Sequence, residues 1–251
     1  MLAARVSRFH PPPVTSLLQA IGMASIFLLA SACEGAPPTP GRLVAQLEAQ
    51  PQILHHRSFA ASAAKAQGPS DLQASHCSVD LYGDSILHGG YGGSFRLEEP
   101  PSTTLHRLRP RYQVTDHTVN GETATARAKV FERESRTGHF VVIAHGINDA
   151  AQNLPLEPAL RAMIAVSRRE GREVILTGLS RQLVPVPGRT YSDGAIRRVA
   201  ADLRVPFADW DTVEYSRAEM ADILHPAKSY SDRLVRRIVN VLDSLAPECA
   251  Q

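Results

Sequence analysis

The 251-residue sequence has little of several features that mark other classes of protein. Its 27 Lys and Arg residues nearly balance its 25 Asp and Glu residues, and no run of like charge occurs. Together with the lack of a nucleic-acid-binding motif, this balance argues against DNA or RNA as a partner. No spacing of His, Cys and carboxylate residues is typical of a metal site, and no glycine-rich phosphate loop precedes a suitable helix.

The main apolar stretch near the N-terminus, Ala20 to Leu29, is shorter than the roughly 20 residues that a membrane-spanning helix needs. Arg5 and Arg8 precede it and Ala30-Ser31-Ala32 follows it, which is the order of a bacterial export signal. We interpret residues 1–32 as a cleaved signal peptide rather than as a membrane anchor. Without Arg5 and Arg8, the 27 basic residues become 25 and equal the 25 acidic residues, so the mature chain is close to neutral.

Cysteine is scarce, with only three residues, and an odd number is awkward in an exported protein because an unpaired thiol tends to mispair. The stretch from Leu29 to Cys33 resembles a lipobox, where bacterial lipoproteins are cut and acylated, so Cys33 is a candidate lipidation site. An ordinary secretion signal would be cut at the same bond, so an envelope lipoprotein and a free periplasmic or secreted protein both stay open. The remaining Cys77 and Cys249 form our predicted disulfide; the alternative is that both stay reduced near the chain ends.

Composition divides the rest of the chain into two parts. Residues 33–75 are rich in Ala, Pro, Gln and Gly and read as a low-complexity tether that is too short of apolar residues to build its own core. The stretch from Leu43 to Glu48 could form one or two helical turns. No internal repeat occurs, so we assign the function to one domain, residues 76–247.

Short apolar runs alternate with helical patterns along this domain. The run from 140 to 144 is almost wholly apolar, as expected for a parallel strand covered on both faces. The alternation predicts a three-layer α/β/α sandwich around a five-stranded parallel sheet, with chemistry beyond the carboxyl ends of the strands. The expected strands are Val79–Tyr82, Tyr112–Val119, Phe140–Ala144, Glu173–Thr177 and Val205–Ala208, and amphipathic helices are expected around Leu160–Val166, Ile196–Leu203 and Leu234–Leu242.

Residues suited to acyl transfer follow several of these strands. Ser85 ends a Gly-Asp-Ser motif after the first strand, where a serine can project its hydroxyl into a cleft. Gly121 and Asn148 follow the second and third strands and offer a backbone N–H and a side-chain amide to an oxyanion. Near the C-terminus, Asp222 precedes His225 by three residues, so the carboxylate can orient the imidazole while its other nitrogen serves the serine. Each of these motifs alone is also common in turns or structural sites.

In this order, four blocks of the chain resemble the pattern of the SGNH (GDSL-like) hydrolase family: Gly83–Ser85, Gly121, Gly146–Asp149 and Asp222–Pro226. The resemblance spans about residues 79–245 and implies an SGNH/flavodoxin-like fold. It implies Ser85 as nucleophile, His225 as base oriented by Asp222, and an oxyanion hole of the Ser85 and Gly121 amides with the Asn148 side chain. Ile86 stands where GDSL-named members have Leu, a near-neutral change at a buried position.

The activity implied by this resemblance is that of an exported serine esterase that needs no cofactor and takes small-molecule or polysaccharide acyl esters. A thioesterase, a lysophospholipase or a sugar O-acyltransferase would use the same residues. A non-catalytic, surface-tethered binding module is the alternative from another class, although all four blocks are present. Contact with a membrane is expected only through an N-terminal lipid anchor. Asp149 is interpreted as a carboxylate that orders a loop or a helix start, and Asp80, Asp84 and Asp193 are likewise interpreted as structural. His145 lies beside the cleft, and nothing in the sequence assigns it a role in proton transfer.

Overall fold

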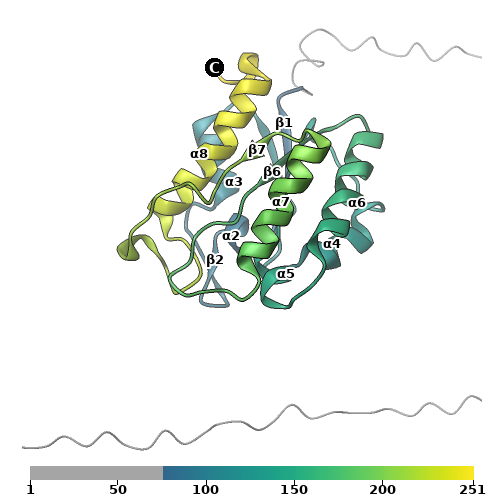
Figure 1. Ribbon diagram of the computed structural model, residues 1–251. Coiled ribbons are helices and arrows are strands. Elements are labelled where there is room, and N and C mark those ends of the chain that lie inside the picture. The colour runs from purple at the N-terminus through teal and green to yellow at the C-terminus, as the bar shows by residue number, and fades with distance from the viewer. Residues whose placement is uncertain (1–75) are drawn as a thin grey trace, which may run out of the picture. The chain divides into compact units, whose positions relative to one another are not determined.

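A parallel sheet of five strands forms the centre of the structure, a computed structural model that describes residues 76–251 (Figure 1). The strands are β1 (Ser78–Gly83), β4 (Gln113–Asp116), β5 (Phe140–Ala144), β6 (Glu173–Thr177) and β7 (Phe207–Ala208), in the spatial order β4-β1-β5-β6-β7. Numbered by their order among these five, this is the 2-1-3-4-5 order of flavodoxin-like folds. The predicted signal peptide, residues 1–32, the tether, residues 33–75, and Cys33 lie outside the described residues.

Two layers of helices cover the sheet, one on each face (Figure 1). One layer contains α4 (Ala124–Phe131), α6 (Leu156–Arg169) and α7 (Arg189–Leu203), which contact one another in that order. The other contains α3 (Pro101–Leu108) and α8 (Lys228–Leu245). This arrangement confirms the predicted three-layer α/β fold.

Short elements complete the structure, several of them at the carboxyl edge of the sheet. Two short helices, α2 (Ser85–His88) and α5 (Ile147–Ala151), begin within three residues of strand ends. A small antiparallel hairpin of β2 (Gly90–Tyr91) and β3 (Phe95–Arg96) follows α2. Two 3-10 turns, η1 (Arg217–Glu219) and η2 (Pro247–Cys249), flank α8.

Burial explains the sequence pattern of the central strands and the last helix. Every residue of β1 and β5 is buried, because helices cover both faces of the sheet there. Helix α8 buries a stripe that includes Leu234, Ile238 and Leu242, and the indole N–H of Trp210 donates to the Leu234 carbonyl at 2.9 Å. A disulfide joins Cys77, directly before β1, to Cys249 in η2, so the pair predicted from the sequence is bonded in the structure. No helix within residues 76–251 is both long and apolar enough to cross a membrane.

Several features of the fold differ from the sequence prediction, and the main ones concern two strands and two helices. The second sheet strand ends at Asp116, not at Val119, because the Asp116 carboxylate accepts the Thr118 N–H at 3.0 Å and turns the chain. The last strand is two residues long rather than four. Helices α3 and α4 were not predicted. Proline is tolerated at the first position of a helix, and Pro101 occupies that position in α3. In α4, the buried Arg127 interrupts the apolar face.

Candidate active site

Ser85 begins a helix directly after the buried strand β1. Asp84 caps this helix, because its carboxylate accepts the Ile86 N–H at 2.9 Å, and Gly89 ends it in the left-handed conformation (φ 76°). The Ser85 side chain is almost fully buried, at 7% exposure, yet it lines a surface cavity of about 340 Å³. The strand-to-helix turn therefore directs the hydroxyl into the cavity while its backbone stays fixed.

His225 lines the same cavity as Ser85. Its Nε2 is 2.9 Å from Ser85 Oγ, and its Nδ1 is 2.9 Å and 2.8 Å from the two carboxylate oxygens of Asp222. An ionised carboxylate only accepts hydrogen bonds, so Nδ1 carries the proton and Nε2 is free to accept one from Ser85. The structure thus brings the three predicted triad residues into one hydrogen-bonded chain.

The Asp222 carboxylate accepts hydrogen bonds from three backbone N–H groups. It accepts N–H groups from Leu224 at 2.8 Å and His225 at 2.7 Å, and its other oxygen accepts the Gly92 N–H at 2.9 Å. Burial alone would raise the pKa of Asp222, but the hydrogen bonds from Gly92, Leu224 and His225 outweigh it and hold this pKa well below its usual range. Asp222 is therefore a carboxylate throughout the range of pH in which an esterase works.

Gly121 and Asn148 line the same cavity as Ser85 and His225. The Glu122 N–H donates to the Val119 carbonyl at 3.2 Å, and Gly121 has φ of 72°, which is the geometry of a type II turn with glycine at its third position. Because that bond engages Glu122 rather than Gly121, the Gly121 N–H is not needed to close the turn. The four blocks found in the sequence therefore meet at one cavity.

Several residues that line the cavity were not predicted from the sequence. Tyr91 and Leu224 are its larger apolar residues, and Gly90 and Asn120 also line it. Gly90 permits a close approach of the hairpin, since a Cβ there would lie 2.2 Å from Asn120 Oδ1. In the sequence, only their closeness to the four motifs could have indicated that these residues line the cavity. Nothing in their spacing predicts that the hairpin contacts it.

Two buried titratable groups adjoin the site without touching the reacting atoms. Burial lowers the pKa of His145 to about 3, reinforced by the charge of Arg127, so this imidazole is neutral and not a base in the physiological range. Burial raises the pKa of Asp84 to about 7, and the nearby charges of Asp149 and Glu122 add to the effect. Asp84 caps α2, in keeping with the structural role expected of it from the sequence.

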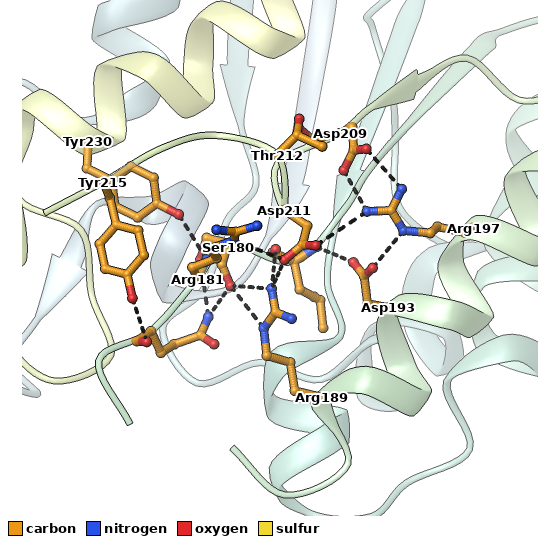
Figure 2. A network of polar contacts seen from close by, with 12 residues as sticks. Ser180, Arg181, Arg189, Asp193, Arg197, Asp209, Asp211, Thr212, Tyr215 and Tyr230 are labelled. Carbon is orange, nitrogen blue, oxygen red and sulfur yellow. Dashed lines mark hydrogen bonds and ion pairs between the residues drawn. The ribbon is translucent and has the colours of Figure 1, made fainter. Parts of the chain in front are cut away.

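A network of arginines and aspartates holds the loops after β6 and β7 (Figure 2). Arg189 donates to Asp211 at 2.8 Å, while Arg197 donates to Asp193 at 2.7 Å and to both oxygens of Asp209. The loop that this network holds reaches the loop that carries His225, because the Leu183 N–H donates to the Ile223 carbonyl at 3.0 Å. The network therefore supports the segment that carries Asp222 and His225.

Asp193 and Asp80 have structural contacts in keeping with the sequence interpretation. The Asp193 carboxylate also accepts the N–H of Leu179, a residue of the loop after β6, at 2.9 Å. Asp80 is fully buried and accepts the Thr137 and Gly138 N–H groups, both at 3.0 Å, just before β5 begins. Within residues 76–251, no group of three or more His, Cys, Asp and Glu residues is arranged to hold a metal ion.

A family model matches most of the folded domain. The model of the GDSL-like Lipase/Acylhydrolase family matches residues 81–232, a segment that contains Ser85, Gly121, Asn148, Asp222 and His225. No curated protein is close enough in sequence to match the chain.

Solved structures show the same fold. TesA is 27% identical, with a TM-score of 0.54 over 67% of this chain and 99% of that one. The psychrotrophic esterase EstA from Pseudoalteromonas sp., in a structure inhibited by monoethylphosphonate, is 15% identical, with a TM-score of 0.56 over 68% of this chain and 99% of that one. A GDSL-like lipase from Bacteroides thetaiotaomicron is 16% identical, with a TM-score of 0.52 over 68% of this chain and 89% of that one.

Proposed function

Because the chain belongs to the GDSL-like lipase/acylhydrolase family, we propose that it is an exported serine esterase in which Ser85, His225 and Asp222 hydrolyse carboxylic esters. One observation carries this proposal: Ser85 Oγ, His225 and Asp222 form an unbroken chain of hydrogen bonds at a cavity open to solvent. In the acylation half, Ser85 Oγ attacks the ester carbonyl while its proton passes to His225 Nε2. The ester oxygen then leaves as an alcohol with the proton from His225, and the acyl group stays on Ser85.

Water completes the reaction in a second half with the same groups. His225 Nε2 takes a proton from water, the resulting nucleophile attacks the acyl carbonyl, and the acid is released as Ser85 regains its proton. In both halves the negative charge that develops on the carbonyl oxygen would be met by the Ser85 and Gly121 N–H groups and by the Asn148 amide. Asp222 stays ionised and stabilises the imidazolium, so no cofactor is required by this sequence of steps.

Export is part of the proposal and rests on the N-terminal sequence. We propose that residues 1–32 are removed and that Cys33 is acylated, which would tether the domain to the bacterial envelope through residues 33–75. The Cys77–Cys249 disulfide supports this view, because disulfides persist in oxidising compartments and are rare in the cytosol of most bacteria. Esters outside the cytoplasm, such as acylated polysaccharides and small lipid esters, are then the substrate class to test.

Related activities and a non-catalytic role are the alternatives. A thioesterase, a lysophospholipase and a sugar O-acyltransferase would use the same triad and differ only in the group that donates or receives the acyl chain. A surface-tethered binding module would have no need to keep the nucleophile, base and carboxylate in hydrogen-bonding contact, so the triad geometry favours catalysis.

A phosphonate probe tests the proposed chemistry directly. EstA is inhibited by monoethylphosphonate, so we would treat this protein with an ethyl phosphonate that carries a p-nitrophenolate leaving group. We expect Ser85 Oγ to displace p-nitrophenolate and to carry the phosphonyl group, as peptide mass analysis would show. The Ser85→Ala variant should stay unlabelled and should lose p-nitrophenyl acetate hydrolysis by on the order of 10⁴-fold or more, with an unchanged circular dichroism spectrum.

The matched control is Ser167→Ala, since Ser167 is fully buried and donates only to the Met163 carbonyl of its own helix. It should be labelled and active like the wild type. A folded Ser85→Ala protein with near-normal activity would refute the serine-esterase proposal. Product analysis with acetylated polysaccharide, an acyl-CoA and a sugar acceptor would then separate hydrolysis of esters, hydrolysis of thioesters and acyl transfer.

A further inference from the structure

The turn that carries Gly121 is fixed to the nucleophile strand by a backbone hydrogen bond just before the glycine. The Val119 N–H donates to the carbonyl of Gly83, the last residue of β1, at 3.0 Å. After Gly121 the chain enters α4, on the sheet face opposite to α3 and α8. The position of the Gly121 N–H relative to the other oxyanion donors therefore depends on what holds the beginning of α4.

Asn148, in the short helix α5, already reaches this segment. Its Nδ2 donates to the Glu122 carbonyl at 3.1 Å. A side-chain amide has two N–H groups, so this bond leaves one for a substrate oxygen in the cavity that Asn148 lines. The same bond also decides the orientation of the amide, because the amide oxygen would be repelled by the Glu122 carbonyl.

Asp149, the next residue, accepts hydrogen bonds from the beginning of α4. Its side chain is fully buried, and it accepts the Ala124 N–H at 2.8 Å, the Thr125 N–H at 3.1 Å and the Thr125 hydroxyl at 2.9 Å. The first N–H groups of a helix have no partner within the helix, and the positive end of the helix dipole favours a carboxylate there. Thr123 caps the same helix through the Ala126 N–H at 3.0 Å, so Asp149 adds a second, long-range cap.

We infer that Asp149 is a positioning residue that sets the distance between the Gly121 N–H and the Asn148 amide in the oxyanion hole. Asn148 and Asp149 are adjacent, so a single turn of α5 holds Glu122 by one side chain and the start of α4 by the next. The turn that carries Gly121 lies directly before these two contacts. The inference rests on the proposed esterase function, because only an acyl-transfer site needs both donors at one oxygen.

The test compares Asp149→Asn and Asp149→Ala with a matched buried aspartate, Asp80→Asn. Asp80 also binds two backbone N–H groups, but it does so at the opposite end of β5 from the site. For p-nitrophenyl acetate we expect Asp149→Ala to lower kcat by about 10- to 100-fold with KM within about 3-fold, because small misplacements of reacting groups have effects of this size. Asp149→Asn should lie between this variant and the wild type, and Asp80→Asn should lower the thermal midpoint with kcat within about 2-fold.

A double variant separates positioning from simple stabilisation. If Asp149 acts through Asn148 and Gly121, adding Asp149→Ala to Asn148→Ala should cost much less than it costs alone. The inference would be overturned if the fold-losses in kcat of the two single variants multiply in the double variant. It would also be overturned if the Asp149→Ala protein has an unchanged kcat. If Asp149→Ala does not fold, Thr125→Val removes only the hydroxyl bond to Asp149 and should still lower kcat several-fold with little change in KM.

A nuclear magnetic resonance experiment tests the positioning role of Asp149 even if the esterase proposal fails. In ¹H–¹⁵N spectra, the Gly121 amide and the Asn148 side-chain amide should shift in Asp149→Asn and not in Asp80→Asn. Unchanged resonances of both groups in a folded Asp149→Asn protein would overturn the positioning role. Absence of Ser85 labelling and of ester hydrolysis in the wild type would instead overturn the proposed function, so the two failures are distinguishable.

Discussion

The backbone N–H of Gly92 donates to Asp222 across 130 residues of sequence, at 2.9 Å, and joins the β2–β3 hairpin to the carboxylate that contacts His225. The hairpin also supplies Tyr91 to the cavity wall. Asp222 is thus fixed by its own loop and by a segment that lines the cavity, so its orientation toward His225 depends on both.

Replacing Asp222 by Asn tests the consequence of this arrangement. An Asn side chain keeps the shape but offers an N–H, which opposes the proton on His225 Nδ1 and the Gly92 N–H. We expect kcat for p-nitrophenyl acetate to fall by about 10⁴-fold, as loss of a triad carboxylate does elsewhere. Circular dichroism should show a folded protein; a fall of less than about 10-fold would mean that Asp222 does not orient the base.

Loss of the Asn148 side chain should affect the chemical step rather than substrate binding. Removal of one oxyanion donor typically lowers kcat by about 10²- to 10³-fold, and Asn148→Ala should lie in this range with KM nearly unchanged. Steady-state kinetics with p-nitrophenyl acetate would measure both constants. An effect on KM alone would exclude Asn148 as an oxyanion donor.

Asp84 should make the folded protein less stable as the pH rises. In the fold its pKa is raised to about 7, whereas the unfolded value is about 3.9, so between these values the native state holds a proton that the unfolded state has released. Its contribution is therefore fully present below about pH 4 and is lost as the pH rises through 7, with an amplitude on the order of 4 kcal/mol.

Asp84→Asn isolates this contribution, because Asn also caps helices and does not titrate. Urea unfolding at pH 5 and at pH 8 should show that the variant gains stability relative to the wild type at the higher pH. Carboxylates whose pKa is lowered, such as Asp80 and Asp116, have the opposite sign and are common to both proteins. An equal difference between the two proteins at both pH values would contradict the prediction.

The Cys77–Cys249 disulfide closes a loop of 172 residues, which nearly spans the domain. In the chain-entropy model, so long a loop corresponds to about 5 kcal/mol of stabilisation, and many disulfides give less. We expect the Cys77→Ser/Cys249→Ser protein to unfold at a clearly lower temperature than the oxidised wild type, by differential scanning calorimetry. Reduced wild type is the control and should resemble the double variant.

The cavity should favour short acyl chains. It measures about 340 Å³, and three glycines, Gly90, Gly93 and Gly121, stand among its lining residues, while Tyr91 and Leu224 give only a small apolar wall. Each methylene gains about 0.8 kcal/mol only if it is buried, so carbons beyond this wall add little. The ratio kcat/KM should be higher for p-nitrophenyl acetate or butyrate than for laurate; a rise through twelve carbons would be the contrary result.

Local patterns in the sequence determined the fold class and the identity of the site blocks. Strands β5 and β6 have the predicted bounds, because a strand buried on both faces must be a continuous apolar run. The Asp222 to His225 contact is also local, since three residues separate the partners in one loop. Helix α4 could not be predicted in this way, because a buried arginine with carboxylate partners takes a place on its inner face.

The tertiary structure alone decided how these parts meet. Ser85 and His225 are 140 residues apart, and only the parallel sheet, which gathers the carboxyl ends of its strands at one edge, places their reacting atoms 2.9 Å apart. Two other hydrogen bonds likewise join segments whose spacing in the sequence indicates no contact: Gly92 N–H to Asp222, and Ala124 N–H at the start of α4 to Asp149. Local propensity acts over a few residues, whereas these contacts depend on how helices and loops pack against the completed sheet.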